Sequence, residues 1–237
     1  MVGILICGID EAGRGAILGP MVIAGVVIEK KDEKKLRRIG VKDSKVLSPK
    51  RREELAKKIE DIARNIVVLR VQPCKIDSYR AKGINLDKIE AMKMAEIIDM
   101  CGAKKVFVDS LEQNTKKFKN LILSFLKNNN ADLIVENYLD ESIPVVSAAS
   151  IIAKVNRDEA IEDIKKKEGV DFGVGYSHDP STIEFLKKLI KERKGNLPNY
   201  VRKSWVTTQD LLNKNWQQKL KDFFKKDEKC KEGENED

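Results

Sequence analysis

Two adjacent carboxylates at the end of an apolar segment have the clearest potential for chemistry in this sequence. Residues 4–9 are apolar apart from one glycine, Asp10 and Glu11 follow them, and residues 13–15 form a Gly-Arg-Gly loop. Adjacent carboxylates repel each other and lose hydration at the mouth of a buried strand, so a positive partner is expected. A divalent metal ion is the first candidate. The alternative is a pair of acids that merely ends a strand at the surface.

Two further acids follow the same pattern later in the chain. Asp109 ends a short apolar run, and Asp140 lies between another such run and a long apolar helix. Ligand sites of open α/β sheets lie beyond the strand ends, so these acids and the first pair can meet there. Oxygen ligands alone suit Mg²⁺ or Mn²⁺ rather than zinc or copper. Two such ions about 4 Å apart can activate water on one side of a phosphodiester and stabilise the leaving oxygen on the other.

Other reaction chemistries find little support. His178 is the single histidine, which excludes a nuclease that uses two imidazoles, and no G-x-S-x-G segment presents a serine nucleophile. His178 either assists proton transfer or metal release, or is an ordinary loop residue. The glycines around Arg14 do not fit G-x-G-x-x-G, and no G-x-x-x-x-G-K-S/T motif occurs, so a nucleotide cofactor is not indicated.

Two groups of polar residues near the acids could contact a polyanion. Arg14 can pair with one of the acids or hold a backbone phosphate, and we favour the phosphate because the flanking glycines let a ligand approach closely. Ser147, Ser150 and Lys154 recur at helical spacing on an otherwise apolar helix and so form one polar stripe. The stripe either contacts a phosphate or consists of serines bonded to the helix backbone and a lysine that reaches solvent.

The elements that would position these residues alternate between strands and helices. Apolar runs predict strands over residues 2–9, 21–28, 66–71, 104–108 and 131–135. Helical spacing predicts helices over about 49–63, 86–100, 115–126 and 145–165, one that begins at Asp179-Pro180, and a C-terminal helix marked by Leu212, Trp216, Leu220 and Phe223. Three early strands followed by strand–helix alternation predict an α/β layer.

Length and composition narrow the class of protein. The 237 residues have room for one large domain with a small appendage, and the 41% of hydrophobic residues predicts a globular fold. The net charge of +8 favours a polyanionic partner such as nucleic acid, although lysine-rich faces are commonly just solvated. The cysteines are scattered, so we expect free thiols and a cytoplasmic protein. Neither an apolar run of membrane-spanning length nor a leader is visible, so we expect no export.

Five segments together resemble archaeal ribonuclease HII, the type 2 ribonuclease H family, from residue 4 to about residue 208. They are Gly-Ile-Asp-Glu-Ala-Gly-Arg-Gly at 8–15, Asp-Ser-Lys at 43–45, Val-Asp-Ser at 108–110, Pro-Val-Val-Ser-Ala-Ala-Ser-Ile-Ile-Ala-Lys at 144–154, and Gly-Val-Gly-Tyr at 173–176. Their order and spacing are more specific than any one segment. The resemblance implies a ribonuclease H-like α/β fold, in which helices flank a central mixed five-stranded sheet, with a C-terminal helical extension.

The resemblance also implies an activity. Members of that family hydrolyse the RNA strand of RNA–DNA hybrids and cut at ribonucleotides embedded in duplex DNA, with Mg²⁺ or Mn²⁺ as cofactor. We therefore expect a metal-dependent endoribonuclease that acts by in-line water attack at two metal ions and leaves 3′-hydroxyl and 5′-phosphate ends. We expect a monomer, with a catalytic domain over residues 1–204, the helical extension over 205–226 and a disordered acidic tail over 227–237.

Roles for individual residues follow from the same resemblance. The four metal-site carboxylates of the family match Asp10, Glu11, Asp109 and Asp140. Gly13, Arg14 and Gly15 match the loop that reads the 2′-hydroxyl at the RNA–DNA junction. Tyr176 matches the tyrosine that packs on the adjoining deoxyribose, or is a surface packing residue. Six residues resemble substrate contacts of the family, or are ordinary polar surface residues: Asp43, Ser44, Lys45, Arg202, Lys203 and Ser204.

The chain departs from the family pattern at two loop positions, and two alternative functions stay open. Ala16 and Ser177 stand where family members usually carry proline. We expect the apolar face of the C-terminal helix to pack on the body and its lysines to contact phosphates. One alternative is a phosphotransferase of the actin and sugar-kinase type, which needs a second lobe for which the chain has no room. The other is a catalytically silent nucleic-acid-binding module.

Overall fold

A mixed five-stranded sheet forms the centre of the protein, as the sequence predicted. The computed structural model describes residues 3–41, 47–127 and 131–217. The strands are β1 (Leu5–Ala12), β2 (Met21–Glu29), β3 (Asn65–Val71), β4 (Lys105–Asp109) and β5 (Asp132–Glu136), in the order β3-β2-β1-β4-β5. The first three strands pair antiparallel, whereas β1 with β4 and β4 with β5 pair parallel.

The first strand extends further than the sequence predicted. Asp10 and Glu11 lie inside β1 rather than after it, because β2 pairs with β1 through Ala12 and satisfies its backbone. The parallel pairing with β4 ends earlier, at Ile9 opposite Val108. The two acids of β1 are therefore held rigidly on one side by β2 and project past the end of β4 on the other.

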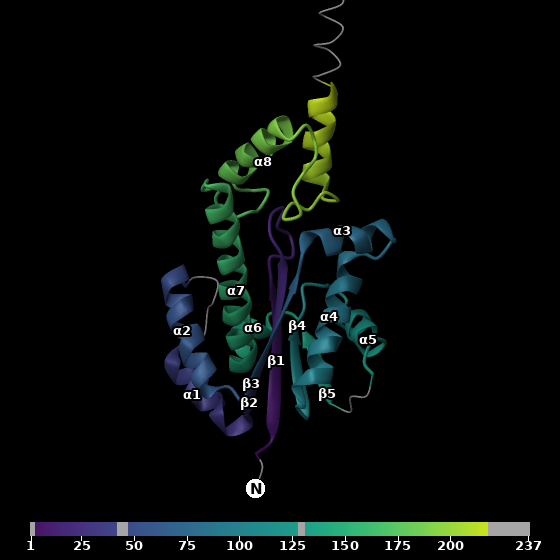
Figure 1. Cartoon of the computed structure of the whole chain (residues 1–237). Coiled ribbons are helices and arrows are strands. Elements are labelled where there is room, and N and C mark those ends of the chain that lie inside the picture. Colours follow the sequence, from purple (N-terminus) through teal and green to yellow (C-terminus); the bar gives the residue numbers. More distant parts are fainter. Residues whose placement is uncertain (1–2, 42–46, 128–130, 218–237) are drawn as a thin grey trace, which may run out of the picture.

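Helices cover both faces of the sheet (Figure 1). One face is covered by α7 (Pro144–Glu168), with α1 (Glu33–Ile39) and α2 (Pro49–Ile62) packed near it. The other face is covered by α4 (Leu86–Cys101) and α5 (Thr115–Leu123). The remaining elements are the 3-10 turn η1 (Lys30–Asp32), α3 (Pro73–Ala81), α6 (Leu139–Ser142), α8 (Pro180–Glu192) and a helical segment over residues 206–217. No helix within the described ranges has the length and apolarity that a membrane crossing requires.

The predicted helices form with small shifts at their ends. Ser48 caps α2 by accepting a hydrogen bond from the Arg51 N–H at 3.3 Å, and Asp179 caps α8 in the same way through the Ser181 N–H at 3.0 Å. The sequence did not predict η1, α1, α3 and α6. These elements are short, and α1 buries only Leu36, so no helical period of apolar residues marks it.

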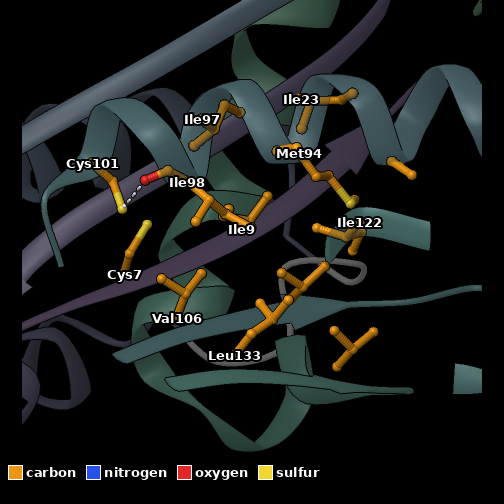
Figure 2. Close-up of a cluster of buried hydrophobic side chains, with 14 of the residues drawn as sticks. Cys7, Ile9, Ile23, Met94, Ile97, Ile98, Cys101, Val106, Ile122 and Leu133 are labelled. Carbon is orange, nitrogen blue, oxygen red and sulfur yellow. Dashed lines mark hydrogen bonds between the residues drawn. The ribbon is translucent and has the colours of Figure 1, made fainter. Parts of the chain in front are cut away.

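The apolar core between the sheet and α4 is drawn in Figure 2. Ile9 and Ile23 of the sheet pack there against Met94 and Ile97 of α4. Cys7 and Cys101 belong to this cluster, and both are free thiols, as the sequence predicted. Cys230 lies outside the described residues. This core fixes α4 against β1 and so fixes the position of the acids that α4 carries.

A separate apolar cluster lies beyond the carboxyl end of β1. Leu18 meets Ile161 of α7, Leu186 of α8 and Val201 there. Leu211 and Leu212 of the segment 206–217 pack against the same cluster, as expected for the C-terminal helix. Trp216, by contrast, is 55% exposed, and Leu220 and Phe223 lie outside the described residues. This cluster anchors the loops that form one wall of the site described below.

Helix α7 approaches β1 so closely that only glycine fits between them. A Cβ atom on Gly8 would lie 2.4 Å from the Val145 carbonyl carbon and oxygen. We therefore expect Gly8→Ala to lower the free energy of unfolding by roughly 1–3 kcal/mol, because backbone has to move to relieve the overlap. Chemical denaturation at neutral pH measures the change. Gly15→Ala is the control for stability, since its Cβ would have no neighbour within 4 Å. Equal stability of the two variants would contradict the close packing.

Candidate active site

Three aspartates from separate elements meet at the carboxyl end of the sheet. Asp10 belongs to β1, Asp109 ends β4 and Asp140 lies in α6, yet each has a carboxylate oxygen within 4.8 Å of the others. Their exposed fractions are 5%, 6% and 4%. Parallel pairing places the ends of β1 and β4 side by side, which explains the meeting of two acids that are 99 residues apart in sequence.

Hydrogen bonds to the backbone hold the third aspartate next to the other two. The Leu139 N–H donates to Asp109 Oδ1 at 2.7 Å and so ties α6 to the end of β4. The Ser147 hydroxyl donates to the Asp140 carbonyl at 2.5 Å and to the Ile143 carbonyl at 3.3 Å. Ser147 of the predicted polar stripe therefore bonds to backbone, which is one of the two alternatives for that stripe.

Glu11 lies apart from the three aspartates. Successive side chains of a strand alternate between faces, so Glu11 shares the α4 face with Cys7 and Ile9, whereas Asp10 faces α7. Its carboxyl group lies near the charge of Glu90 of α4 and lines the same cavity as the aspartates. The sequence predicted four carboxylates at one point. The structure brings three of them together. The fourth, Glu11, follows Asp10 in sequence and lies on the other face of the sheet.

Burial shifts the ionisation of Asp10 and Glu11. Desolvation raises the pKa of Asp10, and the neighbouring Asp140 raises it further, while Lys154 and a hydrogen bond from Ser150 lower it. The pKa of Glu11 is raised well above its usual range by burial and by the charges of Glu90, Asp10 and Asp109. Such a concentration of buried negative charge is costly unless a cation compensates it.

One open cavity of about 410 Å³ collects most of the predicted site residues. It is lined by the three aspartates and Glu11, by the Gly-Arg-Gly loop, and by Lys154 and Tyr176. Ser150 is fully buried behind it and hydrogen-bonds to Asp10, so the polar stripe of α7 points at that aspartate. Asp43, Ser44 and Lys45 lie outside the described residues.

Arg14 pairs with acids outside the cluster of Asp10, Asp109 and Asp140. Its Nε donates to Glu90 at 2.8 Å, and its Nη2 lies 2.5 Å from Asp87 and 3.0 Å from Glu112. All three acids come from α4 or from the segment after β4, and the sequence analysis named none of them. They carry no local signal, because charged residues on helices are usually solvated and only the fold brings these three to one arginine.

Arg202 is buried, whereas its predicted role as a substrate contact requires an exposed side chain. The side chain is fully buried, and its guanidinium group donates to the carbonyls of Gly13, Arg14 and Gly19, with an Nη1 distance of 2.6 Å to Arg14. The structure therefore makes Arg202 an anchor of the glycine loop rather than a residue exposed to a substrate. A buried arginine is stable here because the carbonyls of a tight loop need donors.

Lys203 and Ser204 also bind within the protein. Their backbone N–H groups donate to the Asp77 carboxylate at 2.9 and 3.0 Å, and the Ser204 hydroxyl donates to the same carboxylate at 2.6 Å. Neither residue lines the cavity that holds the aspartates. The segment 202–204 thus connects the glycine loop, which Arg202 binds, to helix α3, which carries Asp77.

Tyr176 is held by two neighbours at the rim of the cavity. Its ring stacks on His178 with 5.4 Å between the ring centroids, and the Arg157 guanidinium lies 4.5 Å from its centroid. His178 therefore supports Tyr176 and is not among the residues that line the cavity.

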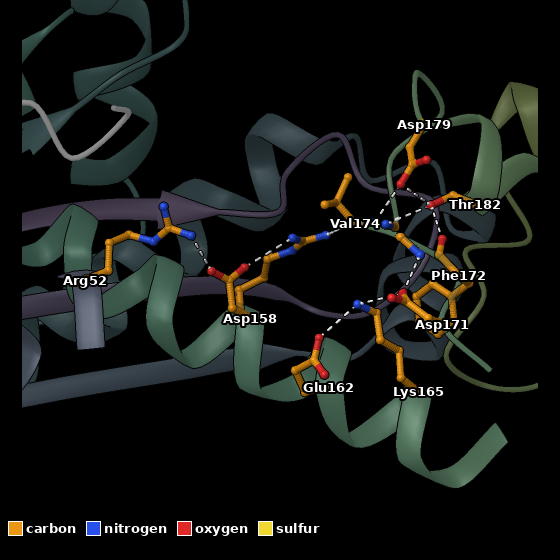
Figure 3. A network of polar contacts seen from close by, with 12 residues as sticks. Arg52, Asp158, Glu162, Lys165, Asp171, Phe172, Val174, Asp179 and Thr182 are labelled. Carbon is orange, nitrogen blue, oxygen red and sulfur yellow. Dashed lines mark hydrogen bonds and ion pairs between the residues drawn. The ribbon is translucent and has the colours of Figure 1, made fainter. Parts of the chain in front are cut away.

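A network of ion pairs connects the same rim to α2, as Figure 3 shows. Arg52 binds Asp158 at 2.7 Å, Asp158 contacts Arg157 at 3.5 Å, and Arg157 donates to the Val174 carbonyl. All three charged side chains line the cavity, and the sequence analysis missed them. Nothing in their spacing distinguishes them from other charged residues on helices α2 and α7.

Comparison with known proteins identifies the family. The model of the ribonuclease HII family matches residues 7–208. The ribonuclease HII of Methanococcus maripaludis strain C6 is 43% identical over 94% of this chain and 93% of that protein. That of Caldivirga maquilingensis is 45% identical over 90% of this chain and 97% of that protein. This chain belongs to the ribonuclease HII family. As a member it is a hydrolytic nuclease with ribonuclease H activity on RNA–DNA hybrids.

Solved structures show the same fold. The ribonuclease H2 from Pyrococcus horikoshii matches with a TM-score of 0.82 and 41% identity, over 89% of this chain and 98% of that one. The ribonuclease HII of Archaeoglobus fulgidus, solved in a complex with PCNA, matches with a TM-score of 0.76 and 42% identity, over 85% and 95%. Bst-RNase HIII in complex with Mn²⁺ is 19% identical and has a TM-score of 0.77 over 89% and 70%, which shows a shared fold alone.

The raised pKa of Glu11 predicts how metal-free protein responds to pH. The folded protein keeps the Glu11 proton to a higher pH than the unfolded chain does. Ionisation of Glu11 therefore lowers the free energy of unfolding as the pH rises from the ordinary glutamate pKa through the raised pKa. We expect Glu11→Gln to raise the Tm of protein in chelator by roughly 2–4 °C at about pH 8, and by less at about pH 5. Calorimetry measures both variants. The exposed Glu54→Gln is the control, and a Tm difference that shrinks with pH would contradict the prediction.

Proposed function

We propose that this protein is an endoribonuclease that cuts RNA–DNA hybrids and also cuts duplex DNA at single embedded ribonucleotides. The observation that carries the proposal is the buried cluster of Asp10, Asp109 and Asp140, which shares one cavity with the Gly-Arg-Gly loop. The donor set consists of carboxylate oxygens alone, which suits a hard divalent cation that binds a phosphodiester. Membership of the ribonuclease HII family supports the hybrid as substrate.

We propose Mg²⁺ or Mn²⁺ as the cofactor. Asp10, Asp109 and Asp140 would hold it, with Glu11 of the same cavity as the fourth ligand. The residues fit such an ion because the three aspartates are buried and each offers a carboxylate oxygen within 4.8 Å of the others. When bound, two such ions would supply an activated water and stabilise the leaving oxygen in an in-line displacement that leaves 3′-hydroxyl and 5′-phosphate ends.

The side chains around the aspartates would orient the substrate. Lys154 lines the cavity near Asp10, where its ammonium group can hold a phosphate oxygen. Ser150 fixes the Asp10 carboxylate through a hydrogen bond. Neither Lys154 nor Ser150 has to transfer a proton in this proposal. The proposal gives no role in proton transfer to His178 either, which is not among the residues that line the cavity.

Recognition of the ribonucleotide would come from the loop of residues 13–15 and from Tyr176. A protein distinguishes RNA from DNA by contacts to the 2′-hydroxyl, and backbone groups of a glycine loop can approach it closely. Gly13 has φ of +77°, and a Cβ atom there would lie 2.8 Å from the Pro20 carbonyl oxygen, so the loop conformation requires glycine at that position. The ring of Tyr176 at the same cavity would pack on the adjoining deoxyribose.

The proposal includes the assembly state and one protein partner. We propose a monomeric enzyme whose catalytic domain ends near residue 204 and is followed by a helical extension. Residues 218–226 of that predicted extension and the predicted acidic tail over 227–237 lie outside the described residues. The ribonuclease HII of A. fulgidus forms a complex with PCNA, and its identity of 42% supports the same partner for this chain. The exposed Trp216, at the end of the described helix, is a large apolar group suited to such a contact.

We expect Asp109→Asn to abolish cleavage and to leave hybrid binding largely intact. The asparagine keeps the shape of the side chain and can still accept from the Leu139 N–H, but removes one charge from the cluster. Labelled duplexes that contain no, one or many ribonucleotides, each tested with Mg²⁺ and with Mn²⁺, measure cleavage, and fluorescence anisotropy in chelator measures binding. The exposed Asp132→Asn is the control.

Two results would overturn the function proposed here. Retained cleavage in Asp109→Asn would show that the cluster is not catalytic. Binding of duplexes by wild-type protein without cleavage under either metal would favour the silent nucleic-acid-binding module instead.

We expect a shortened chain that ends at residue 215 to lose binding to PCNA. The truncation removes Trp216 and everything after it but keeps Leu211 and Leu212, which pack on the apolar cluster beyond the carboxyl end of β1. Calorimetric titration with an archaeal PCNA measures binding, and an unchanged Tm shows that the shortened chain is folded. Equal affinity of the full and the shortened chain would contradict the assignment of this contact to the C-terminal residues.

A further inference from the structure

Glu90 is a buried acid for which the site described so far gives no role. It lies on the face of α4 that packs on the sheet, and it is only 2% exposed. A carboxylate in such a place costs free energy unless cations or hydrogen-bond donors surround it. Its partners therefore indicate what the residue does.

The first partner of Glu90 is the arginine of the glycine loop. Glu90 accepts from Arg14 Nε at 2.8 Å, while Asp87 and Glu112 share Arg14 Nη2. We call these three residues the acid clamp. Asp87 and Glu112 are about one-third exposed, so solvent screens them, and Glu90 is the buried member of the clamp. Within the described part of the chain Nη1 of Arg14 makes no hydrogen bond, and Arg14 lines the cavity.

The second partner of Glu90 is Glu11, the acid next to Asp10. The charge of Glu90 raises the pKa of Glu11, so Glu90 lies close both to the loop arginine and to an acid that lines the cavity of the aspartates. Arg14 also interacts electrostatically with Glu11. If the charge of Glu90 were removed, Glu11 would be the remaining buried carboxylate that attracts Arg14. That pairing would turn the arginine from the substrate side of the cavity toward the sheet.

We propose that Glu90 is a positioning residue of the reaction, which holds the Arg14 guanidinium at the cavity wall and keeps it from pairing with Glu11. The inference rests on the proposed function, in which the loop of residues 13–15 recognises the ribonucleotide, and it adds a contact between the Arg14 side chain and the substrate. Glu90 itself touches no substrate in this arrangement. Its effect on the reaction must therefore pass through Arg14, and that requirement makes the proposal testable.

A double-mutant cycle between Glu90→Gln and Arg14→Ala tests the proposal. We expect Glu90→Gln to raise KM for a duplex with one ribonucleotide by about tenfold, with kcat changed by less than about threefold, because a binding contact is misplaced while the aspartates are intact. In the Arg14→Ala background the same substitution should change neither KM nor kcat further. Affinity for the same duplex in chelator, measured by fluorescence anisotropy, should show the same pattern without any turnover.

Controls separate this proposal from a general effect on folding. Glu96→Gln lies on the same helix and removes an acid that binds Lys93 at the surface, so it should leave KM and affinity unchanged. If Glu90→Gln does not fold, Glu90→Asp, which keeps the charge but withdraws the carboxylate from Arg14 Nε, goes through the same cycle. Its increase in KM should be smaller than about tenfold and should likewise vanish in the Arg14→Ala background.

The outcomes distinguish a failure of this inference from a failure of the proposed function. Two results from an enzyme that still cuts would overturn the positioning role. One is a change in KM on Glu90→Gln that is equal in the wild-type and Arg14→Ala backgrounds. The other is an unchanged KM in both backgrounds. Failure of the wild-type protein to cut any ribonucleotide-containing duplex would instead overturn the proposed function.

Discussion

Desolvated negative charge at one end of the sheet is the constraint on which the rest of the structure depends. Asp10, Asp109 and Asp140 are each at least nine-tenths buried and lie within bonding reach of a common cation. Glu11 and Glu90 add two more buried acids on the other face of β1. Burial raises the pKa of Asp10, Glu11 and Glu90, and a divalent ion is the partner whose charge and ligand preference match the carboxylates.

The fold meets this constraint by bringing rigid elements together at one point. The parallel pair β1 and β4 aligns two aspartates, and the close approach of α7 to Gly8 brings Ser150 and Lys154 over the first of them. The loop that follows β1 is held from behind by Arg202, almost the whole chain away in sequence. Its own arginine is held by the acid clamp. Sites built on such elements keep their geometry without a bound ligand.

Much of the fold could be predicted because it depends on periodic burial. Apolar runs marked all five strands, and the small and apolar face of residues 144–154 marked the buried helix α7. The strand-end rule also predicts that Asp10, Glu11, Asp109 and Asp140 meet, and the three aspartates do lie together. The same reasoning ended β1 too early, because antiparallel pairing with β2 extends a strand beyond its apolar residues.

The remaining details depend on contacts that no local pattern encodes. Glu11 lies on the opposite face from Asp10 because side chains alternate along a strand, a consequence that follows only once both residues are known to lie within β1. Arg202 reads as a surface residue in sequence, and its burial requires the carbonyls of a loop far away in the chain. The partners of Arg14 are ordinary helix and loop acids until α4 is packed on the sheet.

Calorimetric titration of metal-free protein with Mn²⁺ tests the central claim most directly, because it measures cation binding without substrate or turnover. The account predicts that wild-type protein binds Mn²⁺ and that Asp140→Asn weakens the affinity by at least about tenfold, since it removes a ligand charge from the cluster. Asp132→Asn, an exposed acid on β5, should bind as wild type does. Equal affinity of Asp140→Asn and wild type, or no binding to either, would contradict the account.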